Sequence, residues 1–470
     1  MTPRSAAAAL AVALVSVLTR GSAPSERPVR AVAQGDDVAL EVVQDPPEAR
    51  RPSYVLGNSS DVRALAADGA FAWAATSGGL DRYALSSRTP ERRHFGPADG
   101  LDTLDVRAVS VHDGRVVVET ASSHCALHGE RFACRPARPP APAIPRDETF
   151  AGAPVTARLS TSAGELLGTR GAGLWLARGG EQALALGPHQ QAPRSFVRKI
   201  VFYKDRAFVA TFDDGLLSLA ATPATLASQP ELLASASPTA APARMINDVA
   251  TDGSTLWVAA NEGLFFSRDG AKFERVDRIE QRSVTSLALD HDHVWATTNA
   301  ALWKLRTRGT PRVEGNWWRP AGTRSLQAVA VSNGSVFLAS EDRGVIAFDG
   351  RGAFTAFDRL AGLPTSWVLA LASDGRGGVF AATLRDGVVH LDARGAWSIL
   401  KGLPSDWTLD VTADDAGVCV GTQNGAACYD AEGKTVASRL LGLPDPRVHD
   451  VQRIGGRLFV GSEAGAAFFQ

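Results

Sequence analysis

The sequence predicts an all-β protein, a β-propeller of about ten four-stranded blades. Two observations support this prediction. A short pattern of apolar, small and turn-forming residues recurs along the chain, and its copies are spaced by about 43 residues, with the last copy at the C-terminus. A repeat of this length that is built from short strands is typical of propeller blades.

Each copy of the pattern ends its predicted second strand with Thr, Ser or Ala. A large apolar residue stands three positions before this anchor residue, and a small residue usually stands one position before it, as Trp257 and Ala259 do. Residues two apart share one face of a strand, so this face suits close packing of one blade on the next. Glu119 and Thr297 replace the small residue in blades 2 and 6. The anchors are Thr76, Thr120, Thr169, Thr211, Ala260, Thr298, Ser340, Thr383, Thr422 and Ser462.

A Gly and an apolar residue follow most anchors after a short turn, as in Gly79-Leu80 and Gly263-Leu264. Glycine supplies the backbone angles that a tight hairpin needs. Together with the Gly-Leu-Pro segments at 362–364, 402–404 and 442–444, this motif resembles the two-component regulator propeller repeat, over about residues 51–470. In that family the propeller is the extracytoplasmic sensor of a histidine kinase. The resemblance implies the fold and a sensing or binding role; we expect a free-standing propeller without a kinase.

The two ends of the predicted propeller fit together. The last repeat stops at Gln470 after its third strand, whereas Tyr54-Val55-Leu56 forms a strand outside any repeat. We therefore expect residues 53–56 to complete the last blade and to close ten blades into one ring, which protects the strand edges. The alternative is two smaller propellers of five blades, which would need a second closure.

Residues 1–23 have the features of a signal peptide, with Arg4 before an apolar stretch and small residues at 21–23. A membrane anchor or a wrongly assigned start of the chain is the alternative. Residues 24–50 are rich in Pro, Arg and acidic residues and are predicted to be a linker; residues 51–470 form the propeller. We expect a periplasmic or secreted bacterial protein that is not inserted in a membrane after signal cleavage.

Composition limits the partners that can be expected. The 470 residues carry a net charge of −1, so no basic surface favours nucleic acid. We expect a monomer.

Pro- and Ala-rich stretches at 135–154, 187–194 and 221–244 interrupt the repeats, either as loops that cover one face of the propeller or as solvent loops between blades.

The four cysteines predict two disulfides, Cys125–Cys134 and Cys419–Cys428. An even cysteine count in a secreted chain favours disulfides. A two-residue turn at Gly129-Glu130 places Cys125 opposite Cys134 at a non-hydrogen-bonded pair of an antiparallel hairpin, within reach of a disulfide. The second pair has the same spacing. Four buried free thiols are the alternative.

Candidate binding residues stand where each inner strand begins, near one rim of the central channel. Basic residues are expected on one arc of this mouth and mostly acidic ones opposite, unless all are ordinary solvated charges. Trp367 and Trp407 precede neighbouring inner strands and suit stacking of a sugar or peptide; burial between blades is the alternative. The predicted ligand-binding residues are Arg63, Arg107, Arg198, Trp367, Trp407, Asp410, Arg447, His449 and Asp450.

No catalytic motif is found, and we expect no cofactor and no metal site. His112, His124 and His128 lie in one blade but lack the spacing of a known metal site. The sequence favours an extracytoplasmic binding or scaffold module that takes an unknown protein, peptide or glycan ligand at the channel mouth. The alternatives are a glycan-active hydrolase or lyase, by analogy of fold alone, and a sensor subunit for a separate membrane kinase. Whether the protein is an enzyme stays open.

Overall fold

The computed structural model describes β1 (Val29–Gln34), β2 (Asp37–Val42) and residues 49–470. Within the last range it leaves out residues 51, 58, 60, 87–89, 113, 139–147, 187–196, 213, 280–282, 432, 434, 438 and 441–442. The predicted signal peptide lies outside the described residues. β1 and β2 pair as an antiparallel hairpin within the predicted linker. No helix in the described part of the chain is long and apolar enough to cross a membrane.

The described residues form ten blade sheets, nine of four strands and one of five. The prediction of a propeller with about ten blades is therefore confirmed. We number the blades 1 to 10 in chain order. Each blade begins at its inner strand and is antiparallel throughout, and in blade 3 β13 adds a short strand beside the inner one.

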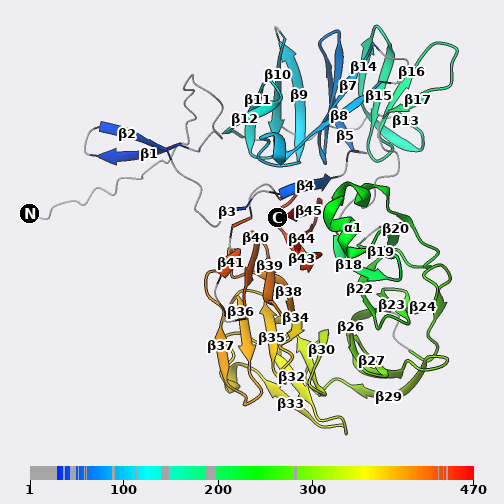
Figure 1. Ribbon diagram of the computed structural model, residues 1–470, viewed down its shortest axis with the longest axis vertical. Helices are drawn as coiled ribbons and strands as arrows, with labels where there is room; N and C mark the ends of the chain where they lie inside the picture. Colours follow the sequence, from blue (N-terminus) through cyan, green and yellow to red (C-terminus); the bar gives the residue numbers. More distant parts are fainter. Residues whose placement is uncertain are drawn as a thin grey trace, which may run out of the picture.

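Blades 4 to 10 close into a ring of seven, which occupies the lower part of Figure 1. Their inner strands contact one another in sequence, and β43 of blade 10 contacts β18 of blade 4 to complete the circle. From the inner strand outward, the strands are β18 (Val197–Tyr203), β19 (Arg206–Thr211), β20 (Leu216–Ala220) and β21 (Ser237–Pro238) in blade 4; β22 (Ile246–Thr251), β23 (Leu256–Ala260), β24 (Gly263–Ser267) and β25 (Glu274–Arg275) in blade 5; and β26 (Val284–Asp290), β27 (His293–Thr298), β28 (Ala301–Arg306) and β29 (Arg312–Trp318) in blade 6. In the same order they are β30 (Leu326–Ser332), β31 (Ser335–Ser340), β32 (Val345–Phe348) and β33 (Phe354–Phe357) in blade 7; and β34 (Val368–Ser373), β35 (Val379–Thr383), β36 (Val388–Leu391) and β37 (Trp397–Ile399) in blade 8. The last two blades have β38 (Thr408–Asp414), β39 (Gly417–Thr422), β40 (Gly425–Tyr429) and β41 (Thr435–Ala437) in blade 9, and β43 (Val448–Ile454), β44 (Arg457–Ser462), β45 (Gly465–Phe469) and β4 (Pro52–Gly57) in blade 10.

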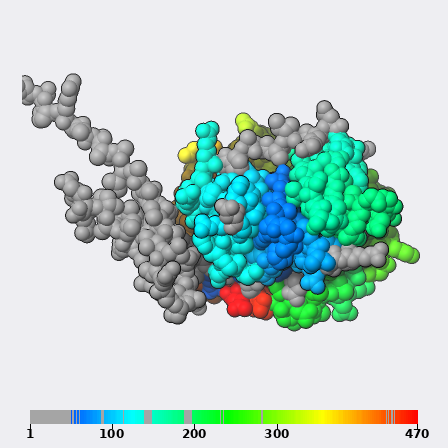
Figure 2. Space-filling model, turned by 90° about the horizontal axis from the view of Figure 1, so that it is seen from above, coloured from blue at the N-terminus to red at the C-terminus, as the bar shows by residue number. Residues whose placement is uncertain are grey.

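Blades 1 to 3 lie outside the ring as a separate row, which we call the three-blade stack. Blade 1 is in the middle, because its inner strand contacts the inner strands of both blade 2 and blade 3. Figure 2 shows the three blades side by side, with blade 2 and blade 3 at the two ends. The strands are β5 (Val62–Ala67), β6 (Phe71–Thr76), β7 (Gly79–Ala84) and β8 (Arg92–Phe95) in blade 1; β9 (Val106–His112), β10 (Arg115–Thr120), β11 (Ser123–His128) and β12 (Arg131–Pro136) in blade 2; and β13 (Thr149–Phe150), β14 (Ala153–Thr161), β15 (Gly164–Thr169), β16 (Leu174–Ala177) and β17 (Leu184–Leu186) in blade 3.

The N-terminal strand completes the last blade, as the sequence predicts. β4 pairs with β45, and Tyr54, Val55 and Leu56 lie opposite Phe468, Ala467 and Ala466. The expected single ring of ten blades is wrong, however, and so is the alternative of two five-bladed rings. After β4 the chain leaves the ring, builds blades 1 to 3, and returns at β18. Seven blades already close the circle, so the three-blade stack is an insertion between β4, the outer strand of blade 10, and β18, the inner strand of blade 4.

Two short segments around the ring closure were not predicted as structured elements. The Pro- and Ala-rich stretch 221–244 contains α1 (Pro223–Ser228) and the 3-10 helix η2 (Pro230–Ser235). Thr222 caps α1, because its hydroxyl accepts a hydrogen bond from the backbone of Thr225. Leu226 and Leu233 are fully buried in the core shared by blades 4 and 10. This stretch therefore seals the ring closure and is neither a cover for one face nor a solvent loop.

The remaining short elements lie between blades. They are β3 (Ala49–Arg50), which pairs in parallel with β42 (Arg439–Leu440), and the 3-10 helices η1 (Pro97–Asp99) and η3 (Arg359–Ala361). η1 contacts β4 and so links the three-blade stack to the ring.

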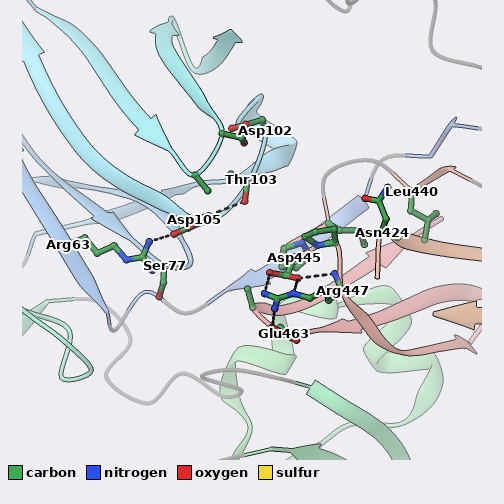
Figure 3. Close-up of a pocket in the computed structure, with 17 residues that line it drawn as sticks. Arg63, Ser77, Asp102, Thr103, Asp105, Asn424, Leu440, Asp445, Arg447 and Glu463 are labelled. Carbon is green, nitrogen blue, oxygen red and sulfur yellow. Dashed lines mark hydrogen bonds and ion pairs between the residues drawn. The ribbon is translucent and has the colours of Figure 1, made fainter. Parts of the chain in front are cut away.

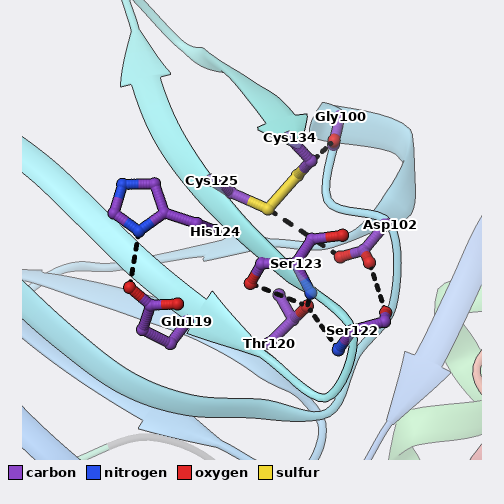
Figure 4. Close-up of a disulfide and its surroundings, with 9 residues drawn as sticks. All are labelled: Gly100, Asp102, Glu119, Thr120, Ser122, Ser123, His124, Cys125 and Cys134. Carbon is purple, nitrogen blue, oxygen red and sulfur yellow. Dashed lines mark hydrogen bonds and ion pairs between the residues drawn. A yellow bond between two sulfur atoms is a disulfide. The ribbon is translucent and has the colours of Figure 1, made fainter. Parts of the chain in front are cut away.

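Both predicted disulfides are present. Cys125 lies directly opposite Cys134 on β11 and β12, and Cys419 lies opposite Cys428 on β39 and β40. The register around Gly129-Glu130 matches the prediction pair by pair. Figure 4 shows the first disulfide beside the loop that carries Gly100 and Asp102. Because disulfides persist in oxidising compartments, both agree with the predicted periplasmic or secreted location.

Candidate ligand-binding site at the channel mouth

Every inner strand of the ring carries a β-bulge at its second residue. In blade 4 the register shifts between Val197 and Lys199, and the other six ring blades show the same shift. A bulge inserts one residue and re-aims its side chain. The seven bulged residues form the rim of the channel, and the residues that follow them form a second tier below. The rim residues are Arg198, Asn247, Thr285, Gln327, Leu369, Leu409 and His449, and the second tier is Lys199, Asp248, Ser286, Ala328, Ala370, Asp410 and Asp450.

Charged side chains gather on the rim at blades 10 and 4. Glu463 pairs with Arg447 at 2.6 Å and with His449 at 3.3 Å. Burial, reinforced by the nearby Arg198 and Arg447, lowers the pKa of His449 to about 4, so this imidazole is neutral at pH 7. Burial also lowers the pKa of Arg198, although Asp248 and Asp410 act in the opposite direction. The Arg198 guanidinium lies 5.9 Å from the ring centre of Phe212, which is exposed at the same rim.

Polar side chains line the rim at blades 5 to 7, with amides in blades 5 and 7 and the hydroxyl of Thr285 in blade 6. Asn247 donates hydrogen bonds to the side chain of Asn261 at 2.9 Å and to the backbone carbonyl of Val284 at 2.8 Å. Gln327 donates to Glu341 at 2.9 Å. These bonds hold the amides at fixed positions, with polar edges available to a ligand.

Aromatic and aliphatic side chains line the rim at blades 8 and 9. Trp367 and Trp407 are 40% and 38% exposed. Both indole rings are therefore accessible at the rim and are not buried between blades. Leu369 and Leu409 are half-buried beside them. The Arg385 guanidinium lies 4.7 Å from the ring centre of Trp407, so a cation–π contact orients this indole.

The second tier ties neighbouring blades together. Asp450 accepts a hydrogen bond from the backbone of Ile200 in blade 4 at 3.2 Å, and Asp248 accepts one from Leu287 in blade 6 at 2.8 Å. Lys199 pairs with Asp248 at 2.6 Å. Burial raises the pKa of Asp450 to about 8 and that of Asp410 to about 6. These carboxyl groups are therefore held within the ring framework below the rim.

The structure separates two of the predicted residues from the others. Arg63 and Arg107 occupy the bulge positions of blades 1 and 2, in the three-blade stack, so they share no mouth with Arg198. Arg63 pairs with Asp61 at 3.2 Å and with Asp105, and Arg107 pairs with the same Asp105 at 3.1 Å. The remaining predicted residues lie at or just below the ring mouth, and they are Arg198, Trp367, Trp407, Asp410, Arg447, His449 and Asp450.

The sequence reasoning missed Phe212, Asn261 and Glu463, which directly follow the anchor residues of their blades. In blades 5 and 10 this residue contacts the bulged residue of its own blade, as Glu463 contacts His449. The fixed spacing from the anchor could have identified these positions as part of the rim.

An open cleft of about 620 Å³ lies beside the mouth, between the three-blade stack and blades 9 and 10. Figure 3 shows Arg63, Asp102 and Asp105 on the stack side, facing Asp445 and Arg447 on the ring side. Each labelled arginine is paired with neighbouring carboxylates, Arg447 with Asp445 at 3.0 Å. Arg447 thus belongs both to the cleft and to the charged part of the mouth.

Metal-ligating side chains cluster poorly in the described part of the chain. The one group close enough to consider is Asp102 with Cys125 and Cys134, and the disulfide occupies both of those sulfurs. This group can therefore hold no metal in the oxidised protein.

The ring and its mouth define a β-propeller protein with an accessible rim. No family model matches the sequence, and no curated protein matches it. The chain is similar in structure to PorZ, described as an essential bacterial surface component of the type-IX secretion system of Porphyromonas gingivalis, with 15% identity and a TM-score of 0.50 over 97% of this chain and 74% of that one. It is also similar to the extracellular domain of BT4673, a putative one component system from B. thetaiotaomicron, with 13% identity and a TM-score of 0.48 over 94% and 72%. The extracellular domain of BT3049, a putative hybrid two component system of the same organism, is similar as well, with 13% identity and a TM-score of 0.48 over 86% of this chain and 60% of that one. At these identities the likeness is one of fold.

Proposed function

We propose that the protein is an extracytoplasmic binding module that holds an anionic ligand at the mouth of its seven-bladed ring. The observation that supports this most is the order of side chains along the rim. The inner strands β34, β38, β43 and β18 are consecutive neighbours in the ring. The exposed indoles of Trp367 and Trp407 therefore continue directly into the charged group of Arg447, His449 and Arg198.

Each part of this strip recognises a different part of a ligand. An indole face suits a flat apolar or sugar surface. The Arg198 guanidinium is partly removed from water, and its lowered pKa shows that burial outweighs the neighbouring carboxylates. A ligand carboxylate or phosphate would offset this cost through charge-assisted, bidentate hydrogen bonds. The amides of Asn247 in blade 5 and Gln327 in blade 7 add hydrogen-bonding groups across the mouth.

No observation favours a hydrolase or lyase. The buried Asp450 is tied to backbone and to Gln452, and it lies below the rim. A sensor role for a separate kinase would use the same mouth and is compatible with the proposal.

The test is a screen of the secreted protein against arrays of acidic and neutral oligosaccharides and acidic peptides, followed by titration calorimetry with the best binder. We expect Arg198→Ala to weaken binding about 10- to 100-fold, since a hydrogen bond to a charged group contributes about 1.5–3 kcal/mol. The double variant Trp367→Ala, Trp407→Ala should weaken it by a similar factor. Arg312→Ala, on the exposed outer strand β29, is the matched control. Affinity that both mouth variants leave unchanged would refute the proposal.

A further inference from the structure

The three-blade stack ends in a face that no described blade covers. Along β10 of blade 2, Val116 and Val118 are buried whereas Val117 and Glu119 are half-exposed. The equivalent ring strand β23 is buried at every residue. Blade 2 therefore buries one face, against blade 1, and leaves its other face open.

This open face of blade 2 has a small apolar centre and a cationic edge. Val117 lies opposite Ala126 in the centre. At one end, His112 lies opposite Arg115 and His128 lies opposite Arg131, and all four side chains are exposed. At the other end His124 pairs with Glu119 at 2.5 Å, as Figure 4 shows. The arginines on this face are Arg115, Arg131 and Arg135, which with the single Glu119 give 3 − 1 = +2.

Blade 3 ends the stack on the other side with a face of opposite charge. Trp175 is half-buried there, 5.5 Å from the ring of Phe150. Arg158 pairs with Glu165 at 2.7 Å and with Glu148 at 3.2 Å, so two carboxylates meet one guanidinium, 1 − 2 = −1. This open face of blade 3 thus offers a large aromatic side chain and net negative charge.

The two open faces are the two halves of an ordinary contact between blades. Blade 1 meets blade 2 with the face that carries Trp73, three positions before its anchor, and blade 3 meets blade 1 with the face that carries Leu166 at the same position. Blade 2 turns this kind of face outward, and it carries Val117. Blade 3 turns the opposite kind outward, where Glu165 and Trp175 are partly exposed and Leu167 between them is buried. Neither face complements a copy of itself, but each complements the other.

We propose that two copies of this chain join their three-blade stacks into one six-bladed ring. The open face of blade 2 in each copy packs on the open face of blade 3 in the other. Both contacts form at once around a two-fold axis, which gives a closed dimer. Six blades lie within the range that propellers use. This dimer replaces the monomer expected from the sequence.

The charges and sizes of the side chains support a second copy of this chain as the partner of the two open faces. Arg115 begins β10 and Glu165 lies at the start of β15, so both stand at the same end of their blades and would face each other across the joint. The small Val117 and Ala126 leave room for the large Trp175 of the other copy. Opposite charges at a joint also select this pairing over contacts between like faces.

The experiment measures molar mass by light scattering during size-exclusion chromatography of residues 24–470, over about 1–100 μM, a range chosen to bracket micromolar affinity. We expect the mass to rise from one copy to two with concentration. Val117→Arg should leave a single copy at every concentration, whereas Asn316→Arg, on the exposed strand β29 of the ring, should behave as the native protein does. Arg115→Glu and Glu165→Arg should each weaken the dimer at least tenfold, and their combination should restore it.

Circular dichroism and the intact Cys125–Cys134 disulfide would show that each variant folds. A single copy at all concentrations would overturn the proposal. A dimer that Val117→Arg leaves intact would overturn it as well, because the contact would then lie elsewhere.

Discussion

The seven-bladed ring and the three-blade stack are built from the same repeat, yet they bury it differently. In both, the anchor threonine is fully buried and donates to a turn carbonyl: Thr422 to Gly425 at 2.7 Å in the ring, and Thr76 to Gly79 at 2.8 Å in the stack. The faces differ. Trp257 in the ring is 0% exposed, whereas Val117 at the same position of blade 2 is half-exposed.

This difference separates two kinds of information in the sequence. The anchor and its turn specify a blade, because they satisfy local hydrogen bonds wherever the blade lies. The side chains on the two faces specify whether a blade has neighbours. Glu119, which replaces a small residue in the repeat, lies on the open face of blade 2 and pairs with His124 there. A carboxylate in contact with an imidazole is tolerated at this position because no described blade covers it.

The largest effect is expected from removing the strand that closes the ring. A chain that begins at Asp61 lacks β4, so β45 becomes an edge strand and the contacts of Tyr54 and Val55 with the ring core are lost. We expect the ring to lose about 3–5 kcal/mol of stability, from the apolar area exposed on two side chains. The three-blade stack keeps all its strands, so its unfolding should change little.

Differential scanning calorimetry measures this as a shift of the ring transition relative to the chain that begins at residue 24. Equal melting of the two chains would show that β4 does not close the ring. Equal losses in ring and stack would show that the two units unfold as one.

The next prediction, whose effect in the ring is of similar size, distinguishes the two faces of single blades. Trp257→Ala removes a fully buried indole and should cost about 3–5 kcal/mol, as large-to-small changes in a packed core do. Val117→Ala changes the equivalent residue of blade 2 and should cost less than about 1 kcal/mol, because its face is open. Urea unfolding at protein concentrations of about 1 μM measures both. Similar losses would mean that something covers the open face of blade 2 in the isolated protein.

The blade pattern and the hairpin registers could be predicted because they rest on local chemistry. Thr76 with Gly79, and Cys125 opposite Cys134, follow from turns of a few residues. The blades that belong to the ring could not be predicted in the same way, because ten similar repeats can close into rings of different blade number. The ring closes where β43 meets β18, and that contact depends on the burial of Leu226 and Leu233 from a stretch without strand alternation.

The candidate site was predicted in part for the same reason. Trp367, Trp407 and His449 follow from the repeat position, whichever blades form the ring. Arg63 and Arg107 occupy the same position, and nothing at that position itself indicates that their blades lie outside the ring. Glu119 was the local signal for this, because a charge on a packing face marks the end of a row of blades.

The last effect depends on pH and concerns the ring closure itself, where Asp450 of blade 10 meets Ile200 of blade 4. Burial, with the nearby Asp410 carboxyl, raises the pKa of Asp450 to about 8 in the folded ring, against an ordinary value near 3.8. The folded state therefore binds a proton more tightly than the unfolded chain does. The stability that comes from this group is fully present below about pH 4 and is lost as the pH rises through about 8. Both hydrogen bonds to the carboxyl reach the same oxygen, Oδ2, from the backbone of Ile200 and from Gln452 Nε2.

An amide oxygen can accept both of these bonds without titrating, so Asp450→Asn should keep the contact and remove its pH dependence. We expect the ring of this variant to gain stability relative to the native ring as the pH rises, by up to about 1.4 kcal/mol per pH unit between pH 5 and pH 8. Asp410 titrates in the same direction in both proteins, with its pKa raised to about 6, so a residual slope remains. The measurement is the melting temperature of the ring between pH 5 and pH 9, with the three-blade stack transition in the same scans as the internal control. Parallel curves for the two proteins would contradict the prediction, because they would show that burial does not raise the pKa of Asp450 in the folded ring.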